Sequence, residues 1–132
     1  MKTQFLTAAL VLAAASLGAS AQTPPAPKIV VDTVLAEQGK AISEAKMCMS
    51  CHTIGQGELA GPDLLGVTER RDTTWLMRFL DDPPAMAETD SIVRIMAEKY
   101  PIPMAKLDLT EAERRALIHY LARESARVPV KQ

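Results

Sequence analysis

Apolar residues recur at intervals of three and four along most of the chain, which is the spacing of one face of an α-helix. Each apolar stretch follows a residue that can cap a helix, such as Asp32 or Thr33 before the first and Thr110, with Glu113, before the last. The stretches span residues 32–49, 72–80, 90–100 and 110–124. We expect Pro83-Pro84 to stop the second of them. Because no useful alternating strand pattern is present, the sequence predicts an all-α fold of three to five short helices.

The beginning of the chain has a different pattern. Lys2 precedes an almost wholly apolar run from Phe5 to Leu17, and the small residues Ala19-Ser20-Ala21 follow. This order is typical of a secretory signal peptide over residues 1–21, cleaved after Ala21, with an uncleaved anchor as the alternative. The run is too short and too poor in Leu and Ile for a good membrane span. We therefore expect a periplasmic protein, with no stable membrane insertion after cleavage.

The rest of the chain divides into three parts. Residues 22–31 contain three prolines and are expected to form an extended tether, and residues 125–132 a loose polar tail. Residues 32–124 then form one small domain. The whole chain has 15 Lys and Arg against 16 Asp and Glu, which argues against a strongly basic nucleic-acid binder. Aromatic residues make up 4%, so a bound apolar cofactor would complete the core.

The sharpest chemical signal is the Cys-x-x-Cys-His motif formed by Cys48, Cys51 and His52. This spacing is the attachment site of c-type haem, because two thiols three positions apart can reach the two vinyl groups along one porphyrin edge. The adjacent imidazole can then face the iron. A thioredoxin-like dithiol is an alternative, although it needs strands that the pattern lacks. A zinc site is another, using these three residues and His119, but their spacing matches no known zinc module.

Further matches extend over residues 34–123, in which the sequence resembles class I c-type cytochromes. Gly39 resembles the glycine that lets the first and last helices of that family cross closely, and Tyr120 its aromatic partner. The stretch Gly61-Pro62-Asp63-Leu64 resembles the family's Gly-Pro-x-Leu loop. The resemblance implies one covalently bound haem c within a cytochrome c fold. It also implies that the Pro62 carbonyl accepts the Nδ1 hydrogen of His52 and raises the basicity of that ligand.

The resemblance further implies a methionine as the second axial ligand, in a loop before the last helix. Met104 occupies such a loop, although Pro103 precedes it where the family more often has Met-Pro. Met96 is the main rival, but on a helix face it is more typical of core packing. Met86, in an expected linker, and His119 are weaker candidates. The expected iron ligands are therefore His52 and Met104.

Two residues that follow the Gly-Pro loop are candidates for contact with the haem propionates. Members of the family often place an Arg and a Trp there, which points to Arg70 or Arg71 and to Trp75. Tyr100, just before the Met104 loop, is a further candidate. The alternative is that both arginines are solvated and that the two aromatic residues only pack in the core.

Two protein ligands would leave no open position on iron, so the expected function is that of a single-electron carrier rather than an enzyme. Ligation by Met and burial of the porphyrin both favour a positive reduction potential. The expected partners are redox proteins such as an oxidase, a reductase or a dehydrogenase. The chain could instead be a fixed haem subunit of such a complex. Were Met104 not to bind, a five-coordinate sensor or peroxidase would be the alternative.

Overall fold

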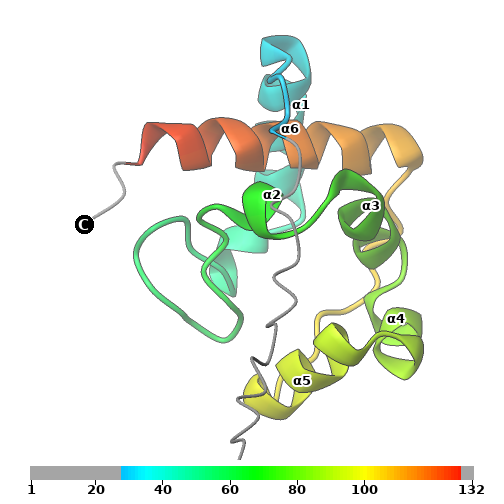
Figure 1. The fold of residues 1–132 in the computed structure, drawn as a ribbon. Helices are drawn as coiled ribbons and strands as arrows, with labels where there is room; N and C mark the ends of the chain where they lie inside the picture. The colour runs from blue at the N-terminus through cyan, green and yellow to red at the C-terminus, as the bar shows by residue number, and fades with distance from the viewer. Residues whose placement is uncertain (1–27, 129–132) are drawn as a thin grey trace, which may run out of the picture.

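The computed structural model describes residues 28–128, so the predicted signal peptide, most of the tether and the last four residues lie outside the described part. The described residues contain helices and no strand (Figure 1). The elements are α1 (Thr33–Ala45), the 3-10 turn η1 (Cys48–Ser50), α2 (Val67–Arg70), α3 (Thr73–Asp81), α4 (Pro83–Thr89), α5 (Ser91–Lys99) and α6 (Glu111–Arg127). The all-α prediction is confirmed. The described residues hold six α-helices rather than three to five, because short α2 and α4 were not expected.

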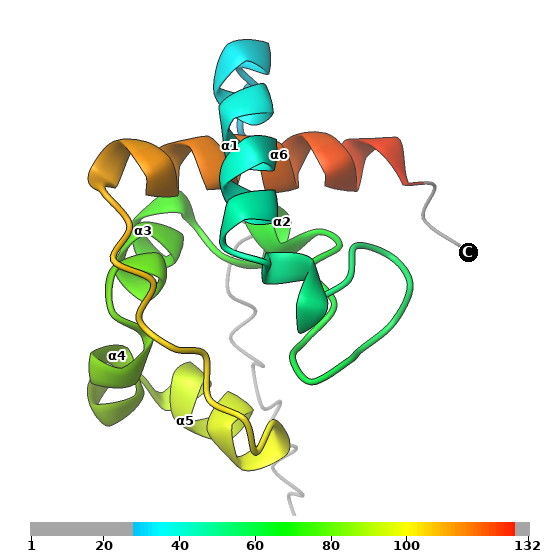
Figure 2. The same ribbon diagram turned by 180° about the vertical axis from the view of Figure 1, so that it is seen from behind.

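The first and last helices cross near their middles and make the most extensive contact between elements (Figure 2). The crossing depends on Gly39, since a Cβ at this position would lie 2.1 Å from the Ala116 carbonyl oxygen and 2.8 Å from the Tyr120 Cβ. The close approach expected at Gly39 is therefore present. An ion pair between buried Arg123 of α6 and Glu37 of α1, at 2.5 Å, also joins the two helices.

The predicted helix starts are confirmed by their capping hydrogen bonds. Asp32 accepts from the first backbone N–H groups of α1, and Asp72 and Asp90 do the same for α3 and α5. Before α6, the side chains of Thr110 and Glu113 each accept from the other's backbone N–H, which is a capping box.

The first helix is shorter than predicted. It ends at Ala45 instead of continuing to about Met49. Met47 has a left-handed backbone conformation, with φ of 52°, which interrupts the helical hydrogen-bond ladder. Residues 48–50 form a separate turn, so the attachment motif lies beyond the helix end rather than on it.

The two prolines end one helix and begin another. Helix α3 stops at Asp81, as expected, but Pro83 and Pro84 occupy the first turn of α4, where a backbone N–H is not needed. Asp82 caps this helix by accepting from the Ala85 N–H at 3.0 Å. Met86 thus lies on a helix and not in the predicted linker.

The last helix is longer than predicted. It continues through Ser125 to Arg127, where an ion pair of 2.9 Å joins Arg127 to Glu124 one turn earlier. Residues 125–127, which the sequence places in a loose tail, are therefore helical, and residues 129–132 of that expected tail lie outside the described residues.

The buried apolar residues, apart from Leu109, lie on α6 and its neighbours α1 and α3, and also on α4 and α5, which contact each other; all are small or medium in size. The buried apolar residues are Ala36, Leu76, Met86, Val93, Leu109, Ala116, Leu117, Ile118 and Leu121. Among the described residues, Trp75, Phe79, Tyr100 and Tyr120 are all absent from this set, in keeping with the thin aromatic content of the chain. Within residues 28–128, no helix has the length and apolar character needed to cross a membrane.

Candidate functional site

The attachment motif forms one tight turn directly after α1. The His52 N–H donates to the Cys48 carbonyl at 3.1 Å, and the Ser50 N–H to the Met47 carbonyl at 3.0 Å. Both cysteines are free thiols, Cys51 exposed and Cys48 half-buried. Burial raises the pKa of the Cys48 thiol, which keeps it protonated at neutral pH. Both sulfur atoms are thus presented from the same turn.

The imidazole of His52 is held from one side by the loop that follows the motif. Its Nδ1 lies 2.9 Å from the carbonyl oxygen of Pro62, where a ring N–H donates. That hydrogen bond sets the tautomer, so Nε2 keeps its lone pair for a metal. Gly61 is required here because a Cβ would lie 2.6 Å from Cε1 of the ring. The Gly61 N–H also donates to the Cys51 carbonyl at 2.8 Å, which ties this loop to the turn.

The carboxylate of Asp63 organises the same loop. It accepts from the backbone N–H groups of Gly55, Gly57 and Leu65 at 2.8, 2.7 and 2.8 Å. Burial raises the pKa of Asp63, but the three backbone donors outweigh burial and hold that pKa below its usual value. Because Asp63 follows Pro62 directly, this network limits the movement of the carbonyl that faces His52.

Met104 lies half-buried in the segment between α5 and α6, where the structure has no regular element. Figure 2 shows this segment running up one side of the molecule, with η1 and the loop after it on the other side. Lys106, two residues beyond Met104, pairs with Asp82 at 2.8 Å. The Leu107 carbonyl accepts from Lys46, which lies two residues before Cys48, at 2.9 Å.

The rival ligands are placed differently. Met86 is only 4% exposed and packs in the core on α4. Met96 is half-buried on α5. His119 accepts at Nδ1 from the Asp32 backbone N–H at 3.0 Å, so it already has a hydrogen-bond partner. In the part of the chain that the structure describes, no three residues among His, Cys, Asp and Glu gather to hold a metal ion, as the zinc alternative would require.

The two arginines expected near the propionates have partners of their own. Arg70 donates to the backbone carbonyls of Leu65 and Asp63. The Arg71 guanidinium lies 5.2 Å from the centroid of the Trp75 ring, over its face. Contact of either arginine with a propionate stays a prediction.

The two aromatic candidates are also engaged. The Trp75 indole N–H donates to Asp90 at 3.0 Å, and its ring stacks on Phe79 with centroids 5.2 Å apart. The Tyr100 hydroxyl donates to Glu58 at 2.7 Å. A propionate would have to share these groups or replace their present partners, so their contact with haem stays a prediction as well.

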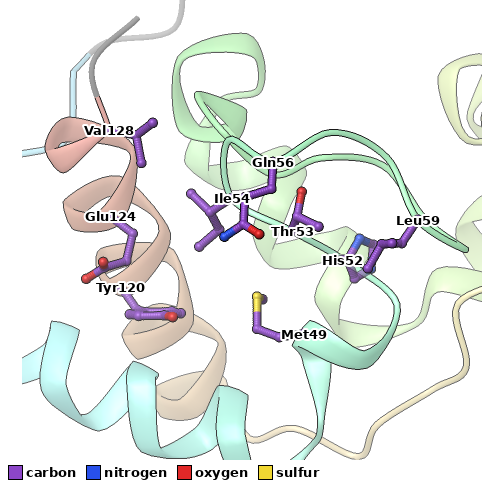
Figure 3. A pocket seen from close by; sticks show the side chains of 9 residues that line it. All are labelled: Met49, His52, Thr53, Ile54, Gln56, Leu59, Tyr120, Glu124 and Val128. Atoms are coloured by element: carbon purple, nitrogen blue, oxygen red, sulfur yellow. The ribbon is translucent and has the colours of Figure 1, made fainter.

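A pocket of about 390 Å³ opens beside the attachment motif (Figure 3). Its lining comes from α6, from η1 and from the loop after the motif: Met49, His52, Thr53, Ile54, Gln56, Leu59, Tyr120, Glu124 and Val128. In Figure 3 Tyr120 and Glu124 face the pocket from α6, opposite the loop residues. The lining includes His52 but neither cysteine nor Met104, so this pocket adjoins the motif and does not join the two expected ligands.

Some residues that shape the site did not stand out in the sequence. The sequence marks Gly61 only as part of a loop motif, because its steric role depends on a ring nine residues earlier. Lys46 and Glu58 contact residues 61 and 41–42 positions away, and no local pattern marks such pairs. The acidic residue after Pro62 was a detectable signal, since Asp in a glycine-rich loop commonly accepts backbone N–H groups.

The donor set fits a covalently attached haem. Two free thiols lie in one turn, and the next residue is an imidazole whose Nδ1 is engaged and whose Nε2 is available. A half-buried thioether lies in a separate segment.

Comparisons with known proteins agree with this geometry. The family model for cytochrome c matches residues 36–124. The structure is similar to cytochrome c from Rhodothermus marinus, with a TM-score of 0.70 and 26% identity over 74% of this chain and 83% of that one. It is also similar to the cytochrome c domain of a Pseudomonas putida protein, with a TM-score of 0.58 and 43% identity over 67% of this chain and 89% of that domain.

A third similar structure is an engineered Rhodothermus marinus cytochrome c bound to a carbene intermediate, with a TM-score of 0.66 and 26% identity over 83% of this chain and 91% of that one. A search among curated protein sequences gives no match. The family model spans about two thirds of the chain and includes the attachment motif, Pro62 and Met104. This chain therefore belongs to the cytochrome c family, whose members are electron-transfer proteins carrying haem c covalently bound.

Proposed function

We propose that this chain is a periplasmic single-electron carrier in which His52 and Met104 are the two axial ligands of one haem c iron. The observation that carries the proposal is the 2.9 Å hydrogen bond between His52 Nδ1 and the Pro62 carbonyl, which leaves Nε2 free for the iron. Haem c, when bound, supplies reversible one-electron chemistry between the ferrous and ferric states.

The residues of the site have different proposed roles. Cys48 and Cys51 hold the group covalently, so a small domain with few aromatic residues retains it even during partial opening. Pro62 orients the imidazole of His52 and raises its basicity, which strengthens it as a ligand. The thioether of Met104 would be the second protein ligand of the iron and would favour its ferrous state.

The proposed location follows from the predicted leader over residues 1–21. The partners that we propose are redox proteins that accept or donate one electron in brief encounters, as is usual for weak electron-transfer complexes. Cell fractionation and N-terminal sequencing test the location. We expect the mature protein in the periplasmic fraction without detergent, beginning at Gln22, and a cytoplasmic full-length chain would contradict this.

The ligand assignment is tested by absorption spectra of the mature protein made together with haem-attachment machinery. We expect a low-spin ferric spectrum with the weak methionine–iron charge-transfer band. The band should be lost in Met104→Ala and kept in Met96→Ala, a matched methionine on α5. A high-spin ferric spectrum, or a band that survives Met104→Ala, would refute the proposed ligation.

A further inference from the structure

The segment that carries Met104 lacks regular structure, so its position depends on the contacts that it makes with other elements. It leaves α5 at Tyr100 and enters α6 after Thr110. Both ends are joined by polar contacts to the attachment segment, which here means residues 46–58, from Lys46 just after α1 to Glu58 in the loop beyond His52. The two segments that carry the expected iron ligands are thus tied directly to each other.

The first tie is at the start of the Met104 segment. One carboxylate oxygen of Glu58 accepts from Lys99 Nζ at 2.5 Å and from the Tyr100 hydroxyl at 2.7 Å. The hydrogen bonds from Lys99 and Tyr100 lower the pKa of Glu58, and the same carboxylate raises the pKa of Lys99. Glu58 is therefore ionised at neutral pH and holds two donors from the end of α5.

The second tie is near the other end of the segment. Lys46 Nζ donates to the Leu107 carbonyl at 2.9 Å, and this contact is partly buried. A hydrogen bond from a charged donor to a backbone carbonyl is stronger than one from a neutral donor. Partial burial protects this hydrogen bond from competing water. Lys46 lies two residues before Cys48, and Leu107 lies three residues after Met104.

We propose that Glu58 and Lys46 are positioning residues that hold the Met104 segment against the attachment segment and so resist displacement of Met104 from iron. This inference rests on the proposed His/Met ligation. An external ligand can take the place of Met104 only when the segment moves away, and both ties oppose that movement. Loss of a tie lowers the free energy of the open state relative to the closed one, with no change at either ligand.

The same segment provides a matched control. Lys106 pairs with Asp82 at 2.8 Å, and this exposed ion pair joins the segment to the start of α4 rather than to the attachment segment. The Lys99–Glu58 pair is at least as exposed, so the two pairs differ in the segments that they join and not in their exposure. Lys106→Gln therefore removes a charge from the same segment while leaving both ties intact.

The test is a titration of the ferric holoprotein with imidazole. Binding is measured by the loss of the methionine–iron charge-transfer band. We expect Lys46→Met, which removes a partly buried charged hydrogen bond, to raise the apparent affinity for imidazole roughly three- to tenfold. We expect Glu58→Ala, which removes two exposed contacts, to raise it roughly two- to fivefold. Glu58→Gln keeps an acceptor for Tyr100 and should lie between wild type and Glu58→Ala. Lys106→Gln should change the affinity less than about twofold, because its pair with Asp82 does not join the segment to the attachment segment.

The outcomes separate the two proposals. Unchanged imidazole affinity in Glu58→Ala and Lys46→Met would overturn the positioning role, provided that Met104→Ala abolishes the band. An equal effect of Lys106→Gln would also overturn it, because the ties would then be no different from any charge on the segment. A band that persists in Met104→Ala would instead refute the ligation itself. Thermal unfolding of each holoprotein shows whether a variant acts only by lowering global stability.

Discussion

The crossing of α1 and α6 makes one substitution especially informative. At Gly39 the two helices approach so closely that a Cβ would lie 2.1 Å from the Ala116 carbonyl oxygen and 2.5 Å from its carbonyl carbon. Both are backbone atoms of the neighbouring helix, which cannot rotate away as a side chain would. Gly39→Ala therefore forces the helices apart, although alanine is the better helix former.

Two opposing contributions determine whether Gly39→Ala raises or lowers the free energy of unfolding. Alanine favours an α-helix over glycine by about 1 kcal/mol. Overpacking a close contact costs about 1–3 kcal/mol where side chains can adjust, and a clash with backbone atoms lies at or above the upper end. The net expectation is a loss of about 2 kcal/mol in the free energy of unfolding, or roughly 8–16 °C in melting temperature for a domain of this size.

The assay is thermal and urea unfolding of the haem-loaded protein, with Gln38→Ala as the control. Gln38 is exposed on the same helix, and glutamine and alanine differ little in helix propensity, so this control should stay within about 0.5 kcal/mol of wild type. A Gly39→Ala protein as stable as wild type, or more stable, would refute the reasoning, because helix propensity and not the crossing would then dominate.

Three further predictions concern a helix cap and the loop beside the attachment turn. Thr110→Ala removes the side-chain acceptor of the α6 capping box and should lower the free energy of unfolding by about 1 kcal/mol in urea, with an unchanged m value. Gly61→Ala pushes a Cβ against the His52 ring and weakens its hydrogen bond to Pro62, so the less basic imidazole should give a higher reduction potential; an unchanged potential would contradict this. The pKa of Asp63 is lowered in the folded state, so its stabilisation is complete above its unfolded pKa, near 3.8, and is lost as pH falls through the folded pKa. Asp63→Asn should therefore be less stable than wild type at pH 7 and should lose less stability on acidification below about pH 4, and parallel pH profiles in urea unfolding would argue against this role.

Local signals in the sequence predicted much of the helical framework. The caps at Asp32, Asp72, Asp90 and Thr110 depend on neighbours within three residues, and all four are present. Gly39 was informative for a different reason, since a glycine inside an apolar helical stretch indicates a close contact with another element.

The structure differs from the sequence prediction where local and long-range interactions compete. The left-handed Met47 ends α1 early, and nothing in the apolar spacing distinguishes it from a helical residue. The apolar pattern predicts only a stop at Pro83 and Pro84, although Asp82 before them is the cap of a new helix. At Met47 the apolar spacing continues past the end of the helix, whereas at Pro83 a capping residue, and not the apolar spacing, marks the new helix.

The reactive residues of the candidate site could be predicted from the sequence, but their arrangement in space could not. The attachment motif is contiguous, so its three reactive side chains could be named from sequence. The ties from Glu58 and Lys46 to the Met104 segment join residues more than 40 positions apart. Nothing in the sequence pairs Glu58 with Lys99 and Tyr100 or Lys46 with Leu107, and only the fold brings them together.

The central claim, a six-coordinate single-electron carrier, is tested most directly by a spectroelectrochemical redox titration of the mature holoprotein, with carbon monoxide added at the reduced end. We predict one reversible one-electron wave with a positive midpoint potential and a ferrous spectrum that carbon monoxide leaves unchanged. A strongly negative midpoint, or rapid carbon monoxide binding to the ferrous form, would show that Met104 does not occupy the sixth position and would contradict the proposed function.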